Sequence, residues 1–244
     1  MTEVLQAKVA AVRAQIAEAA LAAGRNPAEI TLCAATKVQT GDTIRAAIAA
    51  GITVCGENRV QELRQHLEEG AYEGAEVHFI GHLQRNKVKY VVGQVALIHS
   101  VDGEELLGLI DKQAAKLGIV QDILIEVNIA GEASKSGVSP QEAHRLAALA
   151  GQMAHVRLRG LMCIPPAASK NGENCGFFAA MRQLFVDIKE KSYDNENTMD
   201  VLSMGMSGDF ADAIAEGATL VRVGTALFGP RSAAPAHGEA NSDR

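Results

Sequence analysis

The sequence of 244 residues contains no tryptophan, only four cysteines and no long uncharged apolar run. A membrane-spanning helix needs about 20 mostly apolar residues, so the sequence predicts no membrane segment, and we expect a cytoplasmic protein. The cysteines show neither CxxC nor CxxxC spacing, which indicates neither disulfides nor a zinc site. Three of them, Cys33, Cys55 and Cys163, fall in predicted strands, where a thiol behaves as a small hydrophobe.

Positive charge is also scarce, because the chain has 23 lysines and arginines but 29 acidic residues, which gives a formal net charge of −6. This balance gives no general reason to bind nucleic acid, and we interpret the local run Arg85, Lys87 and Lys89 as the solvated face of a helix. Histidines His78, His82 and His99 lie on or just after the third and fourth predicted strands and could in principle hold a metal. No carboxylate accompanies them at ligand spacing, so we predict no metal site.

The sequence does contain a strand-then-helix alternation over almost its whole length. Eight apolar segments read as strands, at 31–37, 52–58, 77–81, 95–101, 122–128, 156–164, 201–205 and 220–224. The segments between them predict helices to about 50 and over 59–69, 84–92, 103–117, 139–153 and 175–191. Eight repeats favour an α/β protein built as one closed (β/α)8 barrel of the TIM type, over about residues 30–229, with no second domain.

Two segments flank this predicted barrel. An amphipathic helix over about 3–23, with apolar positions at Val4, Val9, Val12, Ile16 and Leu21, should cover one end of the barrel or pack beside it. The tail over 230–244 has no periodicity and is predicted to be disordered. Segments 165–176 and 192–198 read as surface loops, and the first follows the sixth strand on the face that carries active sites in this fold, where it could act as a lid.

Lys37 ends the first predicted strand and is the first candidate functional residue. Burial destabilises a charged ammonium group, so a lysine at the end of an apolar strand lowers the stability of the fold and suggests that its amine has a function. Lys37 is therefore a candidate for Schiff-base chemistry. The alternative is that it extends into solvent, with its aliphatic stem lying along the strand end.

Two small-residue turns near the other end of the chain predict a phosphate site. The seventh strand runs into Gly205, Ser207 and Gly208, and the eighth into Gly224 and Thr225. Glycines allow backbone N–H groups to approach an anion, and hydroxyls add further donors. In a closed barrel the eighth strand lies beside the first, so the 224–225 turn and Lys37 should be neighbours, and phosphate sites in this fold are frequent after strands seven and eight.

A lysine beside a phosphate site suits two kinds of chemistry. One is an aldolase acting on a phosphorylated sugar, and the other is binding of pyridoxal phosphate (PLP) through its aldehyde. Arg222, in the apolar eighth strand, favours the second if it points inward, because it could then donate to the pyridine nitrogen. If it points outward, it is an ordinary paired surface residue.

Seven motifs give the chain a specific resemblance to a known family. They are TKVQ around Lys37, GENRVQE at 56–62, HFIGHLQRNK at 78–87, SKSGV at 134–138, RGLMCIP at 159–165, SMGMSGD at 203–209 and VRVGTALFG at 221–229. In this order they resemble the pyridoxal phosphate homeostasis protein family, which is similar to the N-terminal barrel domain of alanine racemase. The resemblance implies that Lys37 is the PLP lysine, that the phosphate contacts Ser207, Gly224 and Thr225, that Arg222 faces the pyridine nitrogen and that Asn58 lies close to the cofactor.

The same resemblance leaves two functions open. A permanent cation at the pyridine nitrogen keeps the ring neutral, which weakens carbanion chemistry and favours holding PLP. A two-base racemase also needs a second acid/base, which in alanine racemase is a tyrosine from a separate domain. The tyrosines here are Tyr72, Tyr90 and Tyr193, all in predicted helices or loops away from the strand ends.

We therefore expect a non-catalytic carrier, with no residue assigned as catalytic, that buffers PLP or supplies it to apoenzymes as transient partners, acting as a monomer. The alternative is a weak PLP-dependent amino-acid racemase. Lys135, after the fifth strand, could offer a second amine for capture or release of PLP, or it is an ordinary loop lysine.

Overall fold

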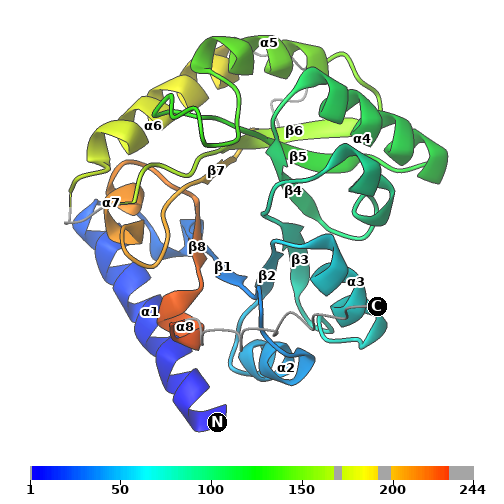
Figure 1. Cartoon of the computed structure of the whole chain (residues 1–244). Coiled ribbons are helices and arrows are strands. Elements are labelled where there is room, and N and C mark those ends of the chain that lie inside the picture. The colour runs from blue at the N-terminus through cyan, green and yellow to red at the C-terminus, as the bar shows by residue number, and fades with distance from the viewer. Residues whose placement is uncertain (1, 168–171, 192–198, 231–244) are drawn as a thin grey trace, which may run out of the picture.

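The computed structural model describes residues 2–167, 172–191 and 199–230, and its core is a closed barrel of eight parallel strands. The strands follow one another around the barrel in chain order, and the eighth pairs with the first (Figure 1). They are β1 (Thr31–Ala35), β2 (Val54–Glu57), β3 (Glu76–Phe79), β4 (Leu97–Val101), β5 (Gln121–Glu126), β6 (Val156–Met162), β7 (Val201–Ser203) and β8 (Leu220–Val223). The predicted (β/α)8 fold is confirmed.

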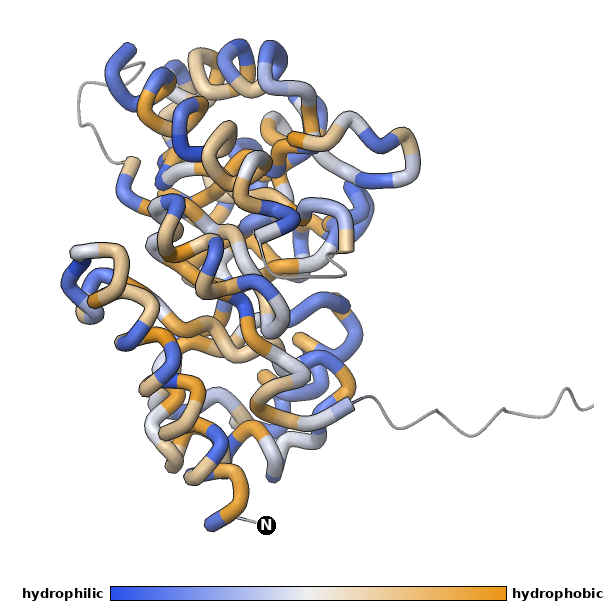
Figure 2. The backbone as a smooth tube through the Cα atoms, turned by 90° about the vertical axis from the view of Figure 1, so that its left-hand side faces the viewer, coloured by the Kyte–Doolittle hydropathy of each residue, from blue (hydrophilic) through white to orange (hydrophobic). Residues whose placement is uncertain are grey.

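Helices surround this barrel on the outside (Figure 1). They are α1 (Thr2–Ala22), α2 (Gly41–Ala49), α3 (Val60–Glu68), α4 (Glu104–Leu117), α5 (Pro140–Ala150), α6 (Cys175–Glu190), α7 (Phe210–Ala215) and α8 (Thr225–Phe228), with two 3-10 helices, η1 (Pro27–Glu29) and η2 (Arg85–Tyr90). In Figure 2 orange and blue alternate along these helices, as expected where one face packs on a sheet and the other meets water. None of the helices in the described ranges is long and apolar enough to span a membrane.

The N-terminal helix α1 packs beside the barrel, against α2, α7 and α8. Two of its predicted core positions are wrong, because Val4 and Leu21 are 61% and 66% exposed. The buried face consists of Leu5, Val9, Val12, Ile16 and Ala20. These residues are three or four apart and share one side of a helix, and Val4 and Leu21 fall just outside that stripe.

Several predicted helices, strands and loops have different boundaries in the structure. The helix predicted over 84–92 is the shorter 3-10 helix η2, in which Val88 is buried, and Val91, three residues later and just past its end, is buried as well. The strand predicted over 31–37 ends at Ala35. The predicted loop 165–176 is described only up to residue 167 and from residue 172, and loop 192–198 and the tail after residue 230 lie outside the described ranges.

The inside of the barrel is not uniformly apolar. Cys33, Val54 and Leu220 form an inner cluster that is separate from the main core beneath the helices. Polar side chains are buried as well, on strands whose side chains alternate between the two faces: His78, His99, Glu126, Ser203 and Arg222. Parallel strands enclosed on both faces are normally apolar, so this polar content needs a separate explanation.

Candidate functional site

Lys37 lies in a turn at the C-terminal end of the barrel and is exposed. The expectation that it ends a buried strand is wrong, because β1 stops at Ala35 and Lys37 follows two residues later. Burial therefore does not distinguish this lysine. Its candidacy rests on its place at the mouth of the barrel and on the turn that carries it.

This turn holds an unusual backbone conformation at Val38. Val38 has a φ of 59°, which is the left-handed region that β-branched residues rarely adopt. Its backbone N–H donates to Glu62 Oε2 of α3 at 2.8 Å. Strained conformations of this kind persist where the surrounding structure enforces them and are concentrated at functional sites. Lys37 is thus carried by a turn that is tied to a neighbouring helix.

The two small-residue turns meet, as the sequence predicts. Ser207 Oγ accepts hydrogen bonds from the backbone N–H groups of Gly224 and Ala226, both at 3.3 Å. Gly205 has a φ of 89°, and a Cβ there would lie 2.6 Å from the Cβ of Ala213, so only glycine fits. Two N–H groups that converge on one oxygen can equally bind an anionic oxygen.

Asp209, which the sequence analysis does not single out, shapes the first of these turns. Its Oδ1 accepts from the N–H of Met206 at 2.7 Å, and its Oδ2 accepts from Asn174 Nδ2 at 2.9 Å. The side chain is buried. The carboxylate therefore fixes the turn that contains Ser207 and joins it to the residue that precedes α6.

The second turn lies against β1. A Cβ at Gly224 would be 3.4 Å from the Cβ of Ala35, and β8 pairs with β1 through Val223 and Ala34. Thr225 is exposed at the first position of α8. The structure thus brings the end of β1, which leads to Lys37, next to the Ser207 and Gly224 turns.

Arg222 points into the barrel, which decides between the two orientations that the sequence leaves open. It is 4% exposed, and it donates from Nη1 to Ser203 Oγ at 2.5 Å and from Nη2 to the carbonyl oxygen of Cys163 at 2.8 Å. Burial lowers the pKa of its guanidinium, but from a value so high that the group stays charged. A buried cation therefore lies beneath the mouth of the barrel.

Asn58 follows β2 at the same end of the barrel, and its Oδ1 is buried with no hydrogen-bond partner within the described ranges. The next loop packs closely on its backbone, because a Cβ at Gly81 would lie 2.1 Å from the Asn58 carbonyl oxygen. A buried acceptor without a donor is costly in a protein, so the oxygen is suited to a ligand group that donates.

Lys135 is held in place at the same end. Its Nζ lies 2.5 Å from Glu132 Oε2 and donates to the carbonyl oxygen of Pro165 at 2.9 Å. These contacts connect the loop after β5 to the segment that follows β6. In this arrangement the amine serves as a structural contact between two loops.

The three histidines do not converge on one point. His99 Nε2 lies 3.0 Å from His78 Nδ1 inside the barrel, whereas His82 is on the surface and pairs with Asp102 at 3.3 Å. No group of three potential metal ligands occurs within the described ranges. Tyr72 contacts His66 at 3.2 Å, Tyr90 lies on η2, and Tyr193 is outside the described ranges.

Glu126, which the sequence analysis misses, is a buried acid at the end of β5. Burial, followed by the charge of Asp102, raises its pKa to about 7, while Arg222 opposes the shift. Between the ordinary glutamate pKa of 4.5 and a pH of about 7, the folded protein therefore keeps a proton on Glu126 that the unfolded chain has released. The corresponding stability, up to about 3 kcal/mol, is fully present below pH 4.5 and is lost as the pH rises through about 7.

We expect Glu126→Gln to remove this pH dependence. The measurement is the free energy of unfolding in urea, for the wild type and the variant, at pH 4.5 and at pH 8. The difference between the two proteins should change with pH, with the variant gaining stability relative to the wild type at pH 8. An equal difference at both pH values would show that Glu126 titrates normally.

Comparisons with known proteins show the family of the chain. Residues 8–232 match the family model described as alanine racemase, N-terminal domain. The pyridoxal phosphate homeostasis protein of Aquifex aeolicus is 43% identical over 217 residues, covering 89% of this chain and 94% of that protein. The protein of the same name from Escherichia coli is 40% identical over 227 residues, with coverages of 91% and 95%.

Solved structures extend the comparison. PipY of Synechococcus elongatus, in a structure with PLP bound, superposes with a TM-score of 0.80 at 32% identity and covers 92% of this chain and 100% of that one. An alanine racemase from Clostridium difficile matches 94% of this chain and 57% of its own with a TM-score of 0.71, but at 12% identity this likeness shows the fold alone. The chain therefore belongs to the pyridoxal phosphate homeostasis protein family and carries the alanine racemase N-terminal domain.

Proposed function

We propose that this protein binds PLP as a reversible Schiff base on Lys37 and acts in PLP homeostasis by buffering PLP or supplying it to apoenzymes. The observation that carries the proposal is the meeting of three groups at one barrel mouth: an amine, converging backbone N–H groups and a buried cation, from Lys37, the Ser207 and Gly224 turns, and Arg222. Relatives named as PLP homeostasis proteins and the PLP-bound PipY structure support it.

The phosphate would be held by the two glycine-containing turns. The N–H groups of Gly224 and Ala226, which now donate to Ser207 Oγ, are suited to phosphate oxygens, and the hydroxyls of Ser207 and Thr225 can donate as well. This supports the assignment of Ser207, Gly224 and Thr225 as phosphate-binding residues. The unpartnered Asn58 Oδ1 supports a contact with a donor group of the ligand.

Arg222 would face the pyridine nitrogen of PLP. An arginine can only donate hydrogen bonds, so the nitrogen that it contacts must be unprotonated. A neutral ring is a weaker electron sink, because the positive charge that would draw electrons from a substrate carbon is absent. The residues therefore suit retention of PLP better than rapid amino-acid chemistry.

The covalent step uses the amine of Lys37. Lys37 would hold PLP through Nζ as a Schiff base with the cofactor's aldehyde, and PLP would supply that aldehyde when bound. Such a bond would be reversible, so PLP could leave Lys37 to water or to the lysine of another protein. Exposure of Lys37 at the mouth leaves room for either route of release. We propose that the protein acts in the cytoplasm as a monomer, a state that light scattering would test.

The alternative function is a weak amino-acid racemase, which the match to the alanine racemase domain favours. Racemisation needs a second acid/base beside Lys37. Of the tyrosines in the described ranges, Tyr72 is engaged with His66 and Tyr90 lies on η2. We therefore expect the PLP-loaded protein, incubated with L-alanine in deuterated water, to exchange no Cα hydrogen above the rate of free PLP. Multiple-turnover exchange, measured by mass spectrometry, would establish the racemase instead.

Supply of PLP gives a second expected result. A PLP-loaded sample should restore activity to an apoenzyme that depends on PLP, whereas a sample reduced with borohydride should not, because reduction converts the reversible bond to a stable amine. Both samples contain the same protein and the same amount of cofactor. If the unreduced sample releases PLP on dilution but leaves the apoenzyme inactive, the supply role fails while the binding role stands.

A further inference from the structure

A chain of buried polar side chains runs through the inside of the barrel from Arg222 toward the opposite end. Arg222 Nη1 donates to Ser203 Oγ at 2.5 Å, and Ser203 Oγ lies 3.1 Å from His99 Nδ1. His99 Nε2 lies 3.0 Å from His78 Nδ1, and His78 Nε2 lies 3.7 Å from Glu76 Oε2. Ser203 and His99 are fully buried, and His78 is 5% exposed. The chain uses side chains from β8, β7, β4 and β3.

The chemistry of its two ends gives this chain a direction. Arginine only donates, and an ionised glutamate only accepts. Burial lowers the pKa of His78 to about 4 and lowers that of His99 well below its usual value, so both are neutral at pH 7. A neutral imidazole has one donor and one acceptor nitrogen, so the Ser203 hydroxyl can donate to His99 Nδ1, and His99 Nε2–H can donate to His78 Nδ1.

In this direction both histidines carry their proton on Nε2. The reverse arrangement would place a lone pair of His78 Nε2 opposite the carboxylate of Glu76, which is unfavourable. In the reverse arrangement Ser203 Oγ would also accept hydrogen bonds from both Arg222 and His99, and its own proton would have to point to a different group. The geometry therefore favours a chain in which Arg222, Ser203 and His99 each donate to the next group, and in which the Nε2–H of His78 points toward the carboxylate of Glu76, 3.7 Å away and beyond hydrogen-bond distance.

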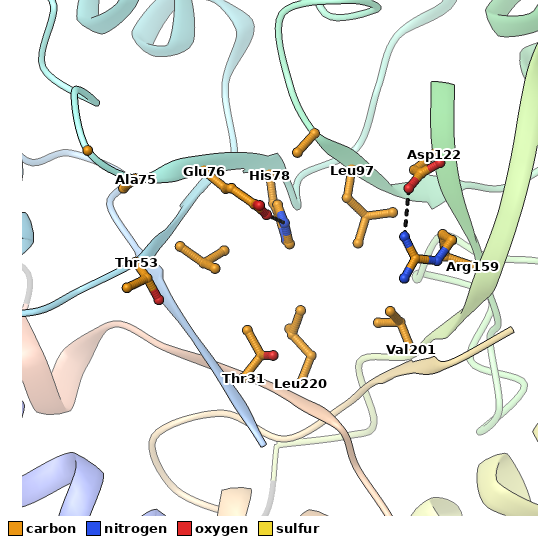
Figure 3. Close-up of a pocket in the computed structure, with 13 residues that line it drawn as sticks. Thr31, Thr53, Ala75, Glu76, His78, Leu97, Asp122, Arg159, Val201 and Leu220 are labelled. Atoms are coloured by element: carbon orange, nitrogen blue, oxygen red, sulfur yellow. Dashed lines mark hydrogen bonds and ion pairs between the residues drawn. The ribbon is translucent and has the colours of Figure 1, made fainter. Parts of the chain in front are cut away.

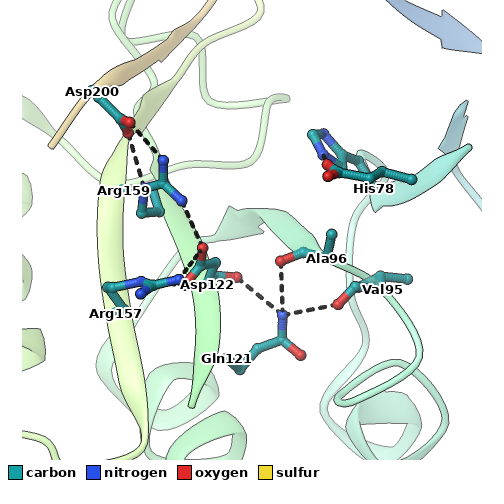
Figure 4. Close-up of polar contacts among 9 residues, drawn as sticks. His78, Val95, Ala96, Gln121, Asp122, Arg157, Arg159 and Asp200 are labelled. Carbon is teal, nitrogen blue, oxygen red and sulfur yellow. Dashed lines mark hydrogen bonds and ion pairs between the residues drawn. The ribbon is translucent and has the colours of Figure 1, made fainter. Parts of the chain in front are cut away.

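The far end of the chain reaches a cavity of about 830 Å³ at the N-terminal end of the barrel. Figure 3 shows His78 and Glu76 on its wall, together with Thr31, Asp122 and Arg159. The other charged groups here are already paired, since Asp122 Oδ2 lies 2.8 Å from Arg159 Nη1 and Arg157 Nε lies 2.6 Å from Asp122 Oδ1 (Figure 4). Glu76, whose side chain is 69% exposed, places Oε2 3.7 Å from His78 Nε2, so its charge acts on that nitrogen without a hydrogen bond.

We propose that His99 and His78 are positioning residues that act through Ser203 to fix the direction of the Arg222 guanidinium toward the pyridine nitrogen of PLP. The inference rests on the proposed function. With His99 accepting its proton, Ser203 presents lone pairs to Arg222, and the guanidinium is anchored at Ser203 and at the Cys163 carbonyl. Without that acceptor the hydroxyl is free to rotate, and one of the two anchors of Arg222 weakens.

The first test uses the protein without PLP. Nitrogen-15 NMR of the imidazole rings should show protonated Nε2 and unprotonated Nδ1 for both His78 and His99, unchanged between pH 6 and pH 8. A proton on Nδ1 of either ring would overturn the directed chain. This measurement does not involve PLP, so it stands even if the proposed function fails.

The second test compares two substitutions of one residue. His99→Leu removes the acceptor, whereas His99→Asn places an amide oxygen near the position of Nδ1 and can still accept from Ser203. After loading with PLP, we expect His99→Leu to shift the visible absorption band and to weaken PLP retention about tenfold, and His99→Asn to resemble the wild type. His155→Leu, which replaces a half-exposed histidine directly before β6, serves as the control.

Ser203→Ala removes the anchor itself and gives the spectrum expected when that anchor is lost, with which His99→Leu is compared. If the leucine disturbs folding, the tautomers measured by NMR decide the direction of the chain. Labelling of Lys37 by borohydride, measured in every sample, reports the proposed function separately. Labelled variants whose spectrum and PLP retention equal those of the wild type would overturn the positioning role. A wild type that is not labelled would instead overturn the proposed function.

Discussion

Lys37→Ala is expected to abolish covalent retention of PLP. In the proposed function the Lys37 amine nitrogen bonds to the aldehyde carbon, so no rearrangement of the remaining site can replace it, and retention after borohydride reduction should fall at least about a hundredfold. Lys37 is exposed in a turn, so the fold should survive the change. The measurement is intact mass and peptide mapping after incubation with PLP and reduction, with the absorption spectrum recorded before and after.

Two lysine variants complete this experiment. Lys116→Ala removes an exposed lysine from the last turn of α4, on the outer layer of the barrel, and should leave labelling unchanged. Lys135→Ala tests the second amine near the site, which is engaged with Glu132 and Pro165. If the label in the Lys37 variant moves to Lys135 at comparable yield, Lys37 is not the required anchor.

Gly160→Ala is expected to prevent stable folding. Gly160 in β6 has a φ of 149°, and a Cβ there would lie 1.8 Å from the backbone oxygen of Val201, its partner in β7. Neither backbone can yield without breaking the pairing of the two strands. We expect a loss of at least about 3 kcal/mol in the free energy of unfolding, measured by urea denaturation. The same strands lead to Cys163 and Ser203, so any folded fraction should also hold Arg222 poorly.

Gly108→Ala is the matched control, because Gly108 lies inside helix α4, where an added Cβ would meet no neighbouring segment within 4 Å. Alanine is favoured over glycine in a helix by up to about 1 kcal/mol, so this variant should be as stable as the wild type or more so. Equal stability of the two alanine variants would mean that β6 and β7 can separate enough to accept a side chain.

The alternation of elements is predictable because each βα repeat leaves a local signal. Strands enclosed on both faces are apolar, and helices show a three-to-four-residue period, so the sequence alone identifies eight strands. The meeting of the Ser207 and Gly224 turns follows from the pairing of β7 with β8, and closure of the barrel places the second turn beside β1. Strand ends are less predictable: the apolar pattern extends the first strand to Lys37, but the left-handed turn at Val38 ends β1 earlier, and nothing in the sequence marks a valine for that conformation.

The interior polar chain cannot be predicted from sequence for a different reason. Ser203, His99 and His78 lie on three strands, and their contacts depend on the register of those strands around the closed barrel. Sequence spacing alone indicates the histidines only as possible metal ligands. In α1, apolar character alone predicts Val4 and Leu21 in the core, whereas the surface that α1 covers selects the stripe that begins at Leu5.

The left-handed turn at Val38 also bears on how a ligand meets the site. A flexible loop must lose conformational freedom when it closes on a ligand, and that loss weakens association. Here Glu62 and the barrel already hold the backbone beside Lys37 in a conformation that an isolated peptide would avoid. The entropy of ordering this backbone is lost during folding, so in the proposed function the turn beside Lys37 is preorganised and its ordering does not reduce the affinity for PLP.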